Sequence, residues 1–133
     1  MANKKGPLTS AAYKAALAKN HQLSRALGID AVMTKYKLDA LVAPTGGPAW
    51  LVDLVNGDSG TASAPGPSTV TSVAGYPHIT VPAGFFRGLP VGISFFGRAW
   101  SEPALIKLAY AYEQATKHRR PPRFTPTAEL PDR

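Results

Sequence analysis

A short apolar run at residues 40–43, within "LDALVAPT", constrains the fold more than any other feature. Pro44 ends the run, because proline cannot donate to a sheet ladder. Four consecutive apolar residues indicate a strand buried on both faces. The only other strand signal is "HITVPAGFFRGLPVGISFFG", two alternating runs joined by a Gly-containing turn. Because two-stranded pieces are marginal alone, we expect the chain to be part of a larger α/β sheet whose other strands lie elsewhere.

Helical patterns account for most of the remaining sequence. We expect four helices with polar N-caps, at Thr9 or Ser10, Asp30, Ser68 and Ser101. Their expected ends lie near Gly28, Tyr36, Gly75 and Pro121. The first helix carries an apolar stripe, which we expect to pack against other elements; it comprises Tyr13, Ala16, Leu17, Leu23 or Ser24, and Leu27. The last helix places Leu105, Leu108, Ala109 and Tyr112 on one apolar face.

Composition limits the chain to one domain and excludes several classes of protein. The 133 residues fit a single domain over 1–133, with an extended tail expected at 120–133. No apolar run approaches the roughly 20 residues that a membrane helix needs, and no signal peptide is visible at Lys4 and Lys5. The chain contains no cysteine. These features predict a cytoplasmic protein that does not bind membranes.

The net charge of +7 raises the possibility of nucleic-acid binding. Basic residues concentrate in the flanks, residues 1–37 and 117–133, whereas residues 38–116 hold three Lys/Arg against five acids. No stripe of interleaved arginine and aromatic residues accompanies the charge. We therefore expect solvated basic faces and no nucleic-acid partner.

A serine within "GDSG" resembles the nucleophile motif of trypsin-like proteases. Ser59 would need a base in hydrogen-bond reach and a group to orient that base. The sequence offers His21, His78 and His118, and nothing in their spacing brings one to the loop. Asp53 and Asp58 have no histidine nearby to complete a metal site. We expect a solvated turn at Ser59, with no metal and no cofactor.

Several segments together resemble the C-terminal end of amidase signature enzymes, most closely bacterial amidases of the peptide-amidase and cyclic-amide-hydrolase kind. They are "LDALVAPTGGPAW", "LVNGD", "TSVAGYPHITVPAGF", "GLPVGISFFGRAWSEPALIKLAYAYEQAT" and "RRPPRF". The block from "AGYPHITVPAG" to "GLPVGISFFG" is the most specific part. The resemblance implies the C-terminal part of a mixed-sheet α/β fold, with helices packed on a small sheet.

The resemblance also implies hydrolysis of carboxamide C–N bonds. In the family a serine attacks the carbonyl, and a second serine on a cis peptide relays protons between it and a lysine. These residues lie in the N-terminal half of such enzymes, and no segment of this sequence matches them. We therefore expect no catalytic residue here, Ser59 included, and an inactive isolated chain.

The loop that follows the run at 40–43 is the candidate contribution to a substrate pocket. A Gly- and Pro-rich loop as long as residues 45–67 is uncommon unless it is functional, and loops at the carboxyl ends of strands border ligand crevices in α/β sheets. The residues expected to face substrate are Pro44, Thr45, Gly46, Trp50, Asp53, Asn56 and Asp58. A simple turn at 56–58 is the alternative. The expected partner is the N-terminal portion of an amidase, or a second copy in a non-catalytic, oligomerising module.

Overall fold

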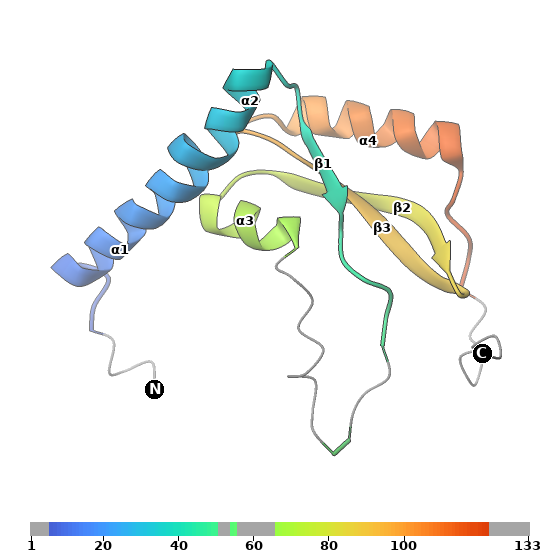
Figure 1. Cartoon of the computed structure of the whole chain (residues 1–133), viewed down its shortest axis with the longest axis horizontal. Helices are drawn as coiled ribbons and strands as arrows, with labels where there is room; N and C mark the ends of the chain where they lie inside the picture. The colour runs from blue at the N-terminus through green and yellow to red at the C-terminus, as the bar shows by residue number, and fades with distance from the viewer. Residues whose placement is uncertain (1–5, 51–53, 56–65, 123–133) are drawn as a thin grey trace.

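The computed structural model of the chain describes residues 6–50, 54–55 and 66–122. Its elements are, in order, α1 (Ala11–His21), η2 (Gln22–Ile29), α2 (Asp30–Tyr36), β1 (Leu41–Pro44), α3 (Pro67–Ala74), β2 (His78–Phe86), β3 (Leu89–Phe96) and α4 (Glu102–Thr116) (Figure 1). Helices packed on a small sheet confirm the α/β class expected from the sequence.

The sheet has three strands in the order β1-β3-β2. The central strand β3 pairs antiparallel with both neighbours, so Phe95 lies between Val42 and Ile79. The predicted hairpin is confirmed: Arg87 and Gly88 join β2 to β3 with φ of 50° and 77°, the positive values that two-residue hairpin turns need. Since both pairings are antiparallel, a mixed sheet requires strands beyond these three.

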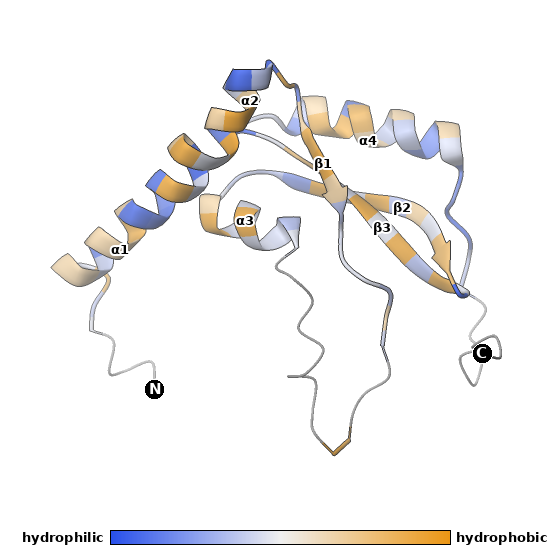
Figure 2. Ribbon diagram, in the orientation of Figure 1, coloured by the Kyte–Doolittle hydropathy of each residue, from blue (hydrophilic) through white to orange (hydrophobic). Residues whose placement is uncertain are grey.

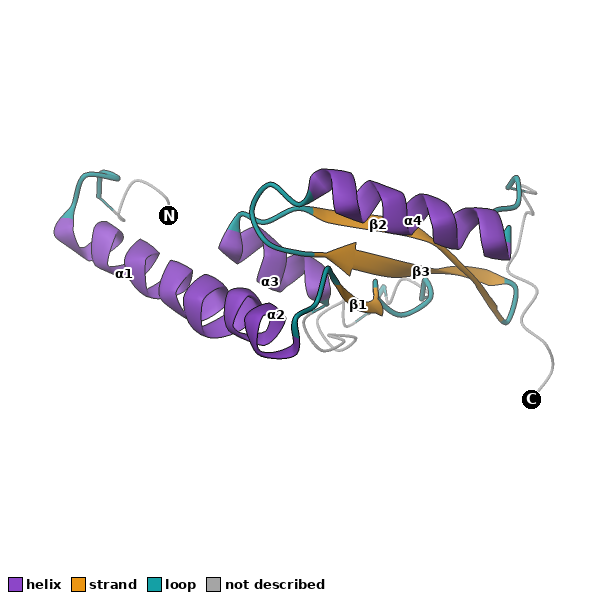
Figure 3. Cartoon of the chain, turned by 90° about the horizontal axis from the view of Figure 1, so that it is seen from above, coloured by secondary structure: helices purple, strands orange, loops and turns teal. Residues whose placement is uncertain are grey.

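Helix α4 covers one face of β2 and β3 (Figure 3). The expected apolar face is confirmed for Leu105 and Ala109, which are almost fully buried, whereas Leu108 is 37% exposed. At the same face, the rings of Phe95 and Tyr112 meet edge to face with centroids 5.9 Å apart. This geometry is favourable for aromatic pairs and fixes the helix along the hairpin.

The opposite face of the sheet packs on the helices before β1 and on α3. Its core cluster contains Ile29, Met33 and Ala74, with Leu41 and Phe96 of the sheet packed against it. Leu41 and Phe96 are register partners, so this cluster sits at the end of the sheet where β1 begins. The far part of the same face, where β1 ends, carries polar side chains instead.

The helix expected to stop at Gly28 continues through it with a distortion. Gly28 adopts φ −108° and ψ −109° inside the π-helical η2, one residue before this element ends, and a Cβ there would lie 2.7 Å from the Leu23 carbonyl oxygen. A glycine at this point bends the continuous helix formed by α1, η2 and α2, which we call the rod, without ending it. The Ser10 cap is confirmed, since Tyr13 N donates to Ser10 Oγ at 3.3 Å.

The other three expected caps are not made. Asp30 lies inside the continuous helical rod and accepts a hydrogen bond from Tyr76 instead. The residue that precedes α3 is Gly66, because Pro67 takes the first helical position and leaves Ser68 inside the helix. Ser101 does precede α4, but its hydroxyl donates to the Arg98 carbonyl at 2.8 Å.

The expected apolar stripe of the first helix is not buried. No residue of α1 is buried, and Leu23 and Leu27 of η2 are 54% and 64% exposed. Ser24, the alternative to Leu23 in the stripe, is buried. The rod extends away from the sheet, and hydrophobic positions recur along it (Figures 1 and 2). Strand β1 likewise departs from the expectation of burial on both faces, since Val42 is 58% exposed. Helix α4 packs chiefly on β2, which leaves the β1 edge uncovered on that side.

A polar contact joins α2 to the segment after α3. Tyr76 Oη donates to Asp30 Oδ2 at 2.8 Å, and the Arg25 guanidinium lies 5.3 Å from the Tyr76 ring centroid. Partial burial, followed by the hydrogen bond to Asp30, raises the pKa of Tyr76 above its usual 10.0. Folding therefore favours the neutral phenol.

Replacing Tyr76 by Phe is expected to lower the free energy of unfolding by about 1 kcal/mol at neutral pH, the usual net worth of one hydrogen bond. Because the folded pKa is raised, this contribution is complete below pH 10 and disappears as the pH rises through the folded pKa. Urea unfolding at pH 7 and above pH 10 measures both effects. Tyr110→Phe is the control, since Tyr110 is 64% exposed; an equal loss in the two variants would contradict the prediction.

Candidate functional site

The chain leaves the sheet at Thr45, directly after β1. Thr45 N donates to the Gly92 carbonyl at 2.9 Å, which extends the pairing with β3 by one residue beyond Pro44. The side chain of Thr45 then lies over the polar part of the sheet, beside residues of both other strands. The start of the long loop is therefore fixed by main-chain and side-chain bonds.

Three hydroxyls, one just after β1 and one from each of β2 and β3, form a cluster at this exit. Thr45 Oγ1 lies 2.7 Å from Ser94 Oγ, Thr80 Oγ1 lies 3.1 Å from the same atom, and Thr45 Oγ1 donates to Thr80 Oγ1 at 3.4 Å. A hydroxyl both donates and accepts, so Ser94, which is 0% exposed, is fully satisfied. We call Thr45, Thr80 and Ser94 the hydroxyl cluster.

The hydroxyl cluster requires a glycine beneath it. A Cβ on Gly92 would lie 2.8 Å from Thr80 Cγ2 and 2.9 Å from Thr45 Oγ1. Real Cβ atoms are not found at such distances, and β-branched threonines have few other rotamers. The absence of a side chain at Gly92 therefore allows the two threonines to converge on Ser94.

Gly92→Ala is expected to lower the free energy of unfolding by about 1–3 kcal/mol, because the added methyl displaces Thr45 or Thr80. Denaturant unfolding of the purified chain measures this loss. Gly46→Ala is the matched control, since a Cβ at Gly46 has nothing within 4 Å. Equal stability of the two variants would show that the cluster has room for the methyl group.

The long loop returns to the point where it starts. A Cβ on Gly66 would lie 2.9 Å from the Thr45 carbonyl oxygen, so the residue before α3 passes directly beside the residue after β1. Both ends of the loop therefore meet at the hydroxyl cluster. Glycine at position 66 is what allows this close approach.

The structure brings together only some of the residues expected to face substrate. Thr45 joins the hydroxyl cluster, Pro44 and Gly46 flank it with exposed surfaces, and Trp50 is 54% exposed farther along the loop. The remaining three expected residues and Ser59 lie outside the described residues, at positions 53, 56, 58 and 59.

Sequence reasoning missed Thr80, Ser94 and Gly92 as site residues. The signal was present, because Thr80 and Ser94 are polar residues inside otherwise apolar strand patterns. Alternation alone places them opposite the face that carries Phe95. Their convergence depends on the pairing of Thr80 with Ser94, which the register supplies.

The chemistry of the hydroxyl cluster is structural. A serine becomes nucleophilic when a neighbouring base accepts its proton, and the partners of Ser94 are two threonine hydroxyls. In the part of the chain that the structure describes, no serine or threonine hydroxyl bonds a histidine or lysine. The cluster therefore orders the exit of β1.

Other functional groups are sparse in the described residues. His78, considered as a base, has a buried Nε2 with no hydrogen-bond partner there. Within residues 6–50, 54–55 and 66–122, no three His, Cys, Asp or Glu side chains gather closely enough to hold a metal ion. Over the same residues, no helix has the length and apolarity to cross a membrane.

Comparison with known proteins gives consistent matches. The sequence model of the Amidase family matches residues 1–106. A probable amidase of Arabidopsis thaliana is 42% identical over 112 residues, which cover 84% of this chain and 18% of that protein. A glutamyl-tRNA(Gln) amidotransferase subunit of Pseudomonas entomophila is 33% identical over 118 residues, which cover 86% of this chain and 24% of that protein.

Solved structures match the fold over nearly the whole chain. The native peptide amidase from Stenotrophomonas maltophilia is 48% identical with a TM-score of 0.79, covering 92% of this chain and 24% of the enzyme. A peptide amidase in complex with the competitive inhibitor chymostatin is 46% identical with a TM-score of 0.84, again covering 92% of this chain and 24% of the enzyme. The chain spans 18% to 24% of the length of these relatives. The resemblance seen in the sequence is thus confirmed, and the chain belongs to the amidase family.

Proposed function

We propose that this chain is the C-terminal portion of a serine amidase that hydrolyses carboxamide C–N bonds. The observation that carries the proposal is the agreement with a peptide amidase over 92% of the chain, at 46% identity and a TM-score of 0.84. In this role the chain supplies sheet strands and part of the substrate pocket. The nucleophilic serine, the relay serine and the lysine come from outside these residues.

The pocket wall begins at the exit of β1. Pro44, Thr45 and Gly46 leave the sheet where the hydroxyl cluster fixes the backbone, and Gly66 returns beside them. A wall must hold its shape so that the reacting carbonyl meets the nucleophile in the correct geometry. In the proposed role, Ser94 and Thr80 are positioning residues that hold Thr45, and the loop beyond Gly46 contacts the substrate.

Exposed apolar side chains support a partner that covers them. Leu23 and Leu27 on the rod and Val42 at the sheet edge are each more than half exposed, and exposed apolar patches mark interaction sites. Because the chain spans only 24% of the peptide amidases, the remainder of an amidase domain is the occupant that we propose for these surfaces.

A non-catalytic module that self-associates is the alternative, and the same exposed side chains favour it. A second copy would cover the rod and the β1 edge by symmetry. Light scattering of the purified chain separates the two ideas. A stable dimer that dissociates on Leu27→Asp would favour the module, whereas a monomer would favour the amidase portion.

A chimera tests the proposed function directly. The segment of the Stenotrophomonas peptide amidase that matches this chain is replaced by residues 1–122, and hydrolysis of a peptide amide is followed by ammonia release. We expect turnover within about 10–100-fold of the parent enzyme, since a wall displaced by about 1 Å costs on the order of 10². The parent enzyme with the segment deleted is the control. A folded but inactive chimera would reject the proposal.

A second pair of chimeras tests the wall. Thr45→Val removes the hydroxyl that bonds Ser94, and it is expected to raise KM or lower kcat about tenfold by releasing the exit of β1. Thr69→Val is the control, because it also removes a threonine hydroxyl, but from an exposed position on α3. Unchanged kinetics in the Thr45 variant would remove the hydroxyl cluster from the proposed wall.

A further inference from the structure

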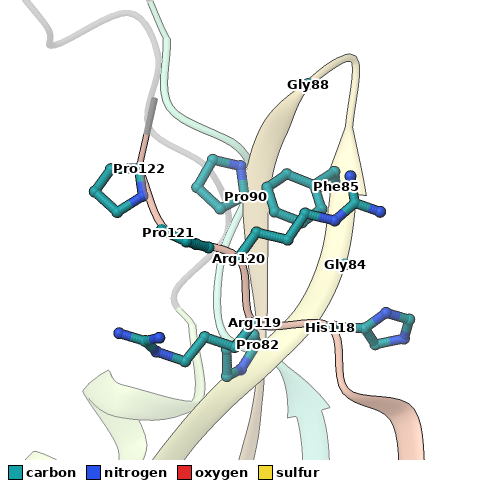
Figure 4. Close-up of a pocket in the computed structure, with 10 residues that line it drawn as sticks. All are labelled: Pro82, Gly84, Phe85, Gly88, Pro90, His118, Arg119, Arg120, Pro121 and Pro122. Carbon is teal, nitrogen blue, oxygen red and sulfur yellow. The ribbon is translucent and has the colours of Figure 1, made fainter. Parts of the chain in front are cut away.

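A pocket lies between the far end of the β2–β3 hairpin and the segment after α4 (Figure 4). Its volume is ≈ 660 Å³, within the range of about 300–1,000 Å³ typical of small-molecule sites. One wall comes from the hairpin and the other from five consecutive residues at 118–122. No residue of the hydroxyl cluster lines this pocket.

Backbone constraints shape both walls of the pocket. Lys117 follows the last residue of α4, and its φ of 49° turns the chain back over the hairpin. Pro121 and Pro122 then hold an extended course because their φ angles are fixed. On the hairpin, the register shifts between Pro82 and Gly84, and Gly84 has φ of 136°, so β2 bends at the pocket. A cavity with rigid walls loses little entropy when it binds a ligand.

The pocket carries unneutralised positive charge. Arg119 and Arg120 line it, and residues 82–90 and 117–122 contain no aspartate or glutamate. Within the described part of the chain, neither arginine forms an ion pair. An anionic group entering the pocket would therefore meet guanidinium donors that no described carboxylate already occupies.

An aromatic ring holds one of these arginines in place. The Arg120 guanidinium carbon lies 4.8 Å from the centroid of the Phe85 ring. Figure 4 shows the side chain of Arg120 beside Phe85. Such stacking uses the face of the guanidinium and leaves its edge N–H groups available to an acceptor. Phe85 keeps 40% of its surface exposed, so apolar area remains for a ligand beside the charged group.

We infer that this pocket binds a small carboxylate that carries a flat apolar group. The carboxylate would accept two parallel hydrogen bonds from Arg120, the geometry that suits a planar guanidinium. Four lining residues are prolines, namely Pro82, Pro90, Pro121 and Pro122, and proline offers no backbone N–H. A phosphate would need donors on several sides of its oxygens, whereas the side chain of Arg119, the other arginine of the lining, points away from that of Arg120 (Figure 4). These walls therefore favour an arylalkanoic acid over a phosphate.

Titration of the 15N-labelled chain with 3-phenylpropanoate tests this inference by NMR. We expect saturable shifts confined to residues 82–90 and 117–122. The uncharged isostere 3-phenylpropanamide should bind at least about tenfold more weakly, because a hydrogen bond to a charged group is stronger than one between neutral groups. Arg120→Gln, at an exposed position, should weaken the binding of 3-phenylpropanoate to a similar extent. The circular dichroism spectrum of this variant should stay unchanged.

Arg87→Gln provides the matched control. Arg87 also stacks on a ring, with its guanidinium carbon 5.5 Å from the Phe86 centroid, but it does not line the pocket. Its replacement should leave the affinity for 3-phenylpropanoate unchanged. Absence of saturable shifts near the solubility limit, equal affinity for the amide, or an undiminished affinity in the Arg120 variant would each overturn the inference. Because the proposed amidase role predicts nothing about this titration, failure of one leaves the other intact.

Discussion

The purified chain by itself is expected to hydrolyse a peptide amide no faster than buffer does. A serine without a positioned base is a weak nucleophile, and loss of a serine hydrolase's nucleophile and base costs on the order of 10⁶ in kcat. Among the described residues, the hydroxyl of Ser94 bonds only the hydroxyls of Thr45 and Thr80. Ammonia release from a peptide amide, compared between the chain and the active chimera, measures the difference.

Covalent labelling gives an independent reading of the same prediction. A fluorophosphonate that reacts with activated serines should modify the chimera and leave the isolated chain unmodified, Ser59 included. Mass spectrometry of the digested chain locates any adduct. Stoichiometric labelling of one serine among residues 1–133, abolished when that serine becomes alanine, would place the nucleophile within this chain and defeat the proposed division of roles.

Leu105→Ala is expected to destabilise the chain by about 2–5 kcal/mol, the usual cost of deleting a buried leucine. Leu105 is 1% exposed and lies on the face of α4 that covers the hairpin. The described core holds few other large buried side chains, chiefly Ile29 and Met33 on the opposite face of the sheet. A loss of this size is comparable with the whole stability of a small domain, so the variant should be largely unfolded at 25 °C.

Urea unfolding followed by circular dichroism measures that loss. Ile106→Ala is the matched control, because Ile106 is the next residue of α4 and is 58% exposed. We expect the control to stay within about 0.5 kcal/mol of the parent chain, as surface substitutions usually do. Similar midpoints for the two variants would mean that α4 does not pack on the hairpin as described.

Local sequence signals predicted the ends of helices and strands well where the backbone conformation of a single residue sets the end. Gly75, with φ of 65°, ends α3 as expected, and the turn at Arg87 and Gly88 joins the predicted hairpin. Predictions failed where a distant segment competes for the same group. Asp30 was expected to cap a helix, yet its carboxylate accepts a hydrogen bond from the hydroxyl of Tyr76, 46 residues away.

Burial was the property least predictable from sequence. The apolar stripe through Leu23 and Leu27 has the spacing of a packed helix face, yet both side chains are more than half exposed. Periodicity shows which side chains share a face, but it does not show whether anything covers that face. For Val42 the apolar run predicted a buried strand, and the tertiary arrangement made β1 an edge strand with one uncovered side.

The sequence by itself determined the order of the elements, the hairpin and the family, because turn residues, alternation and a specific run of motifs are local properties of the chain. Only the tertiary structure decided that Thr45, Thr80 and Ser94 meet above Gly92, and that Arg120 stacks on Phe85 beside a pocket. Such contacts join residues 14 to 49 positions apart. They depend on strand register and on the course of the chain after α4, which no local pattern encodes.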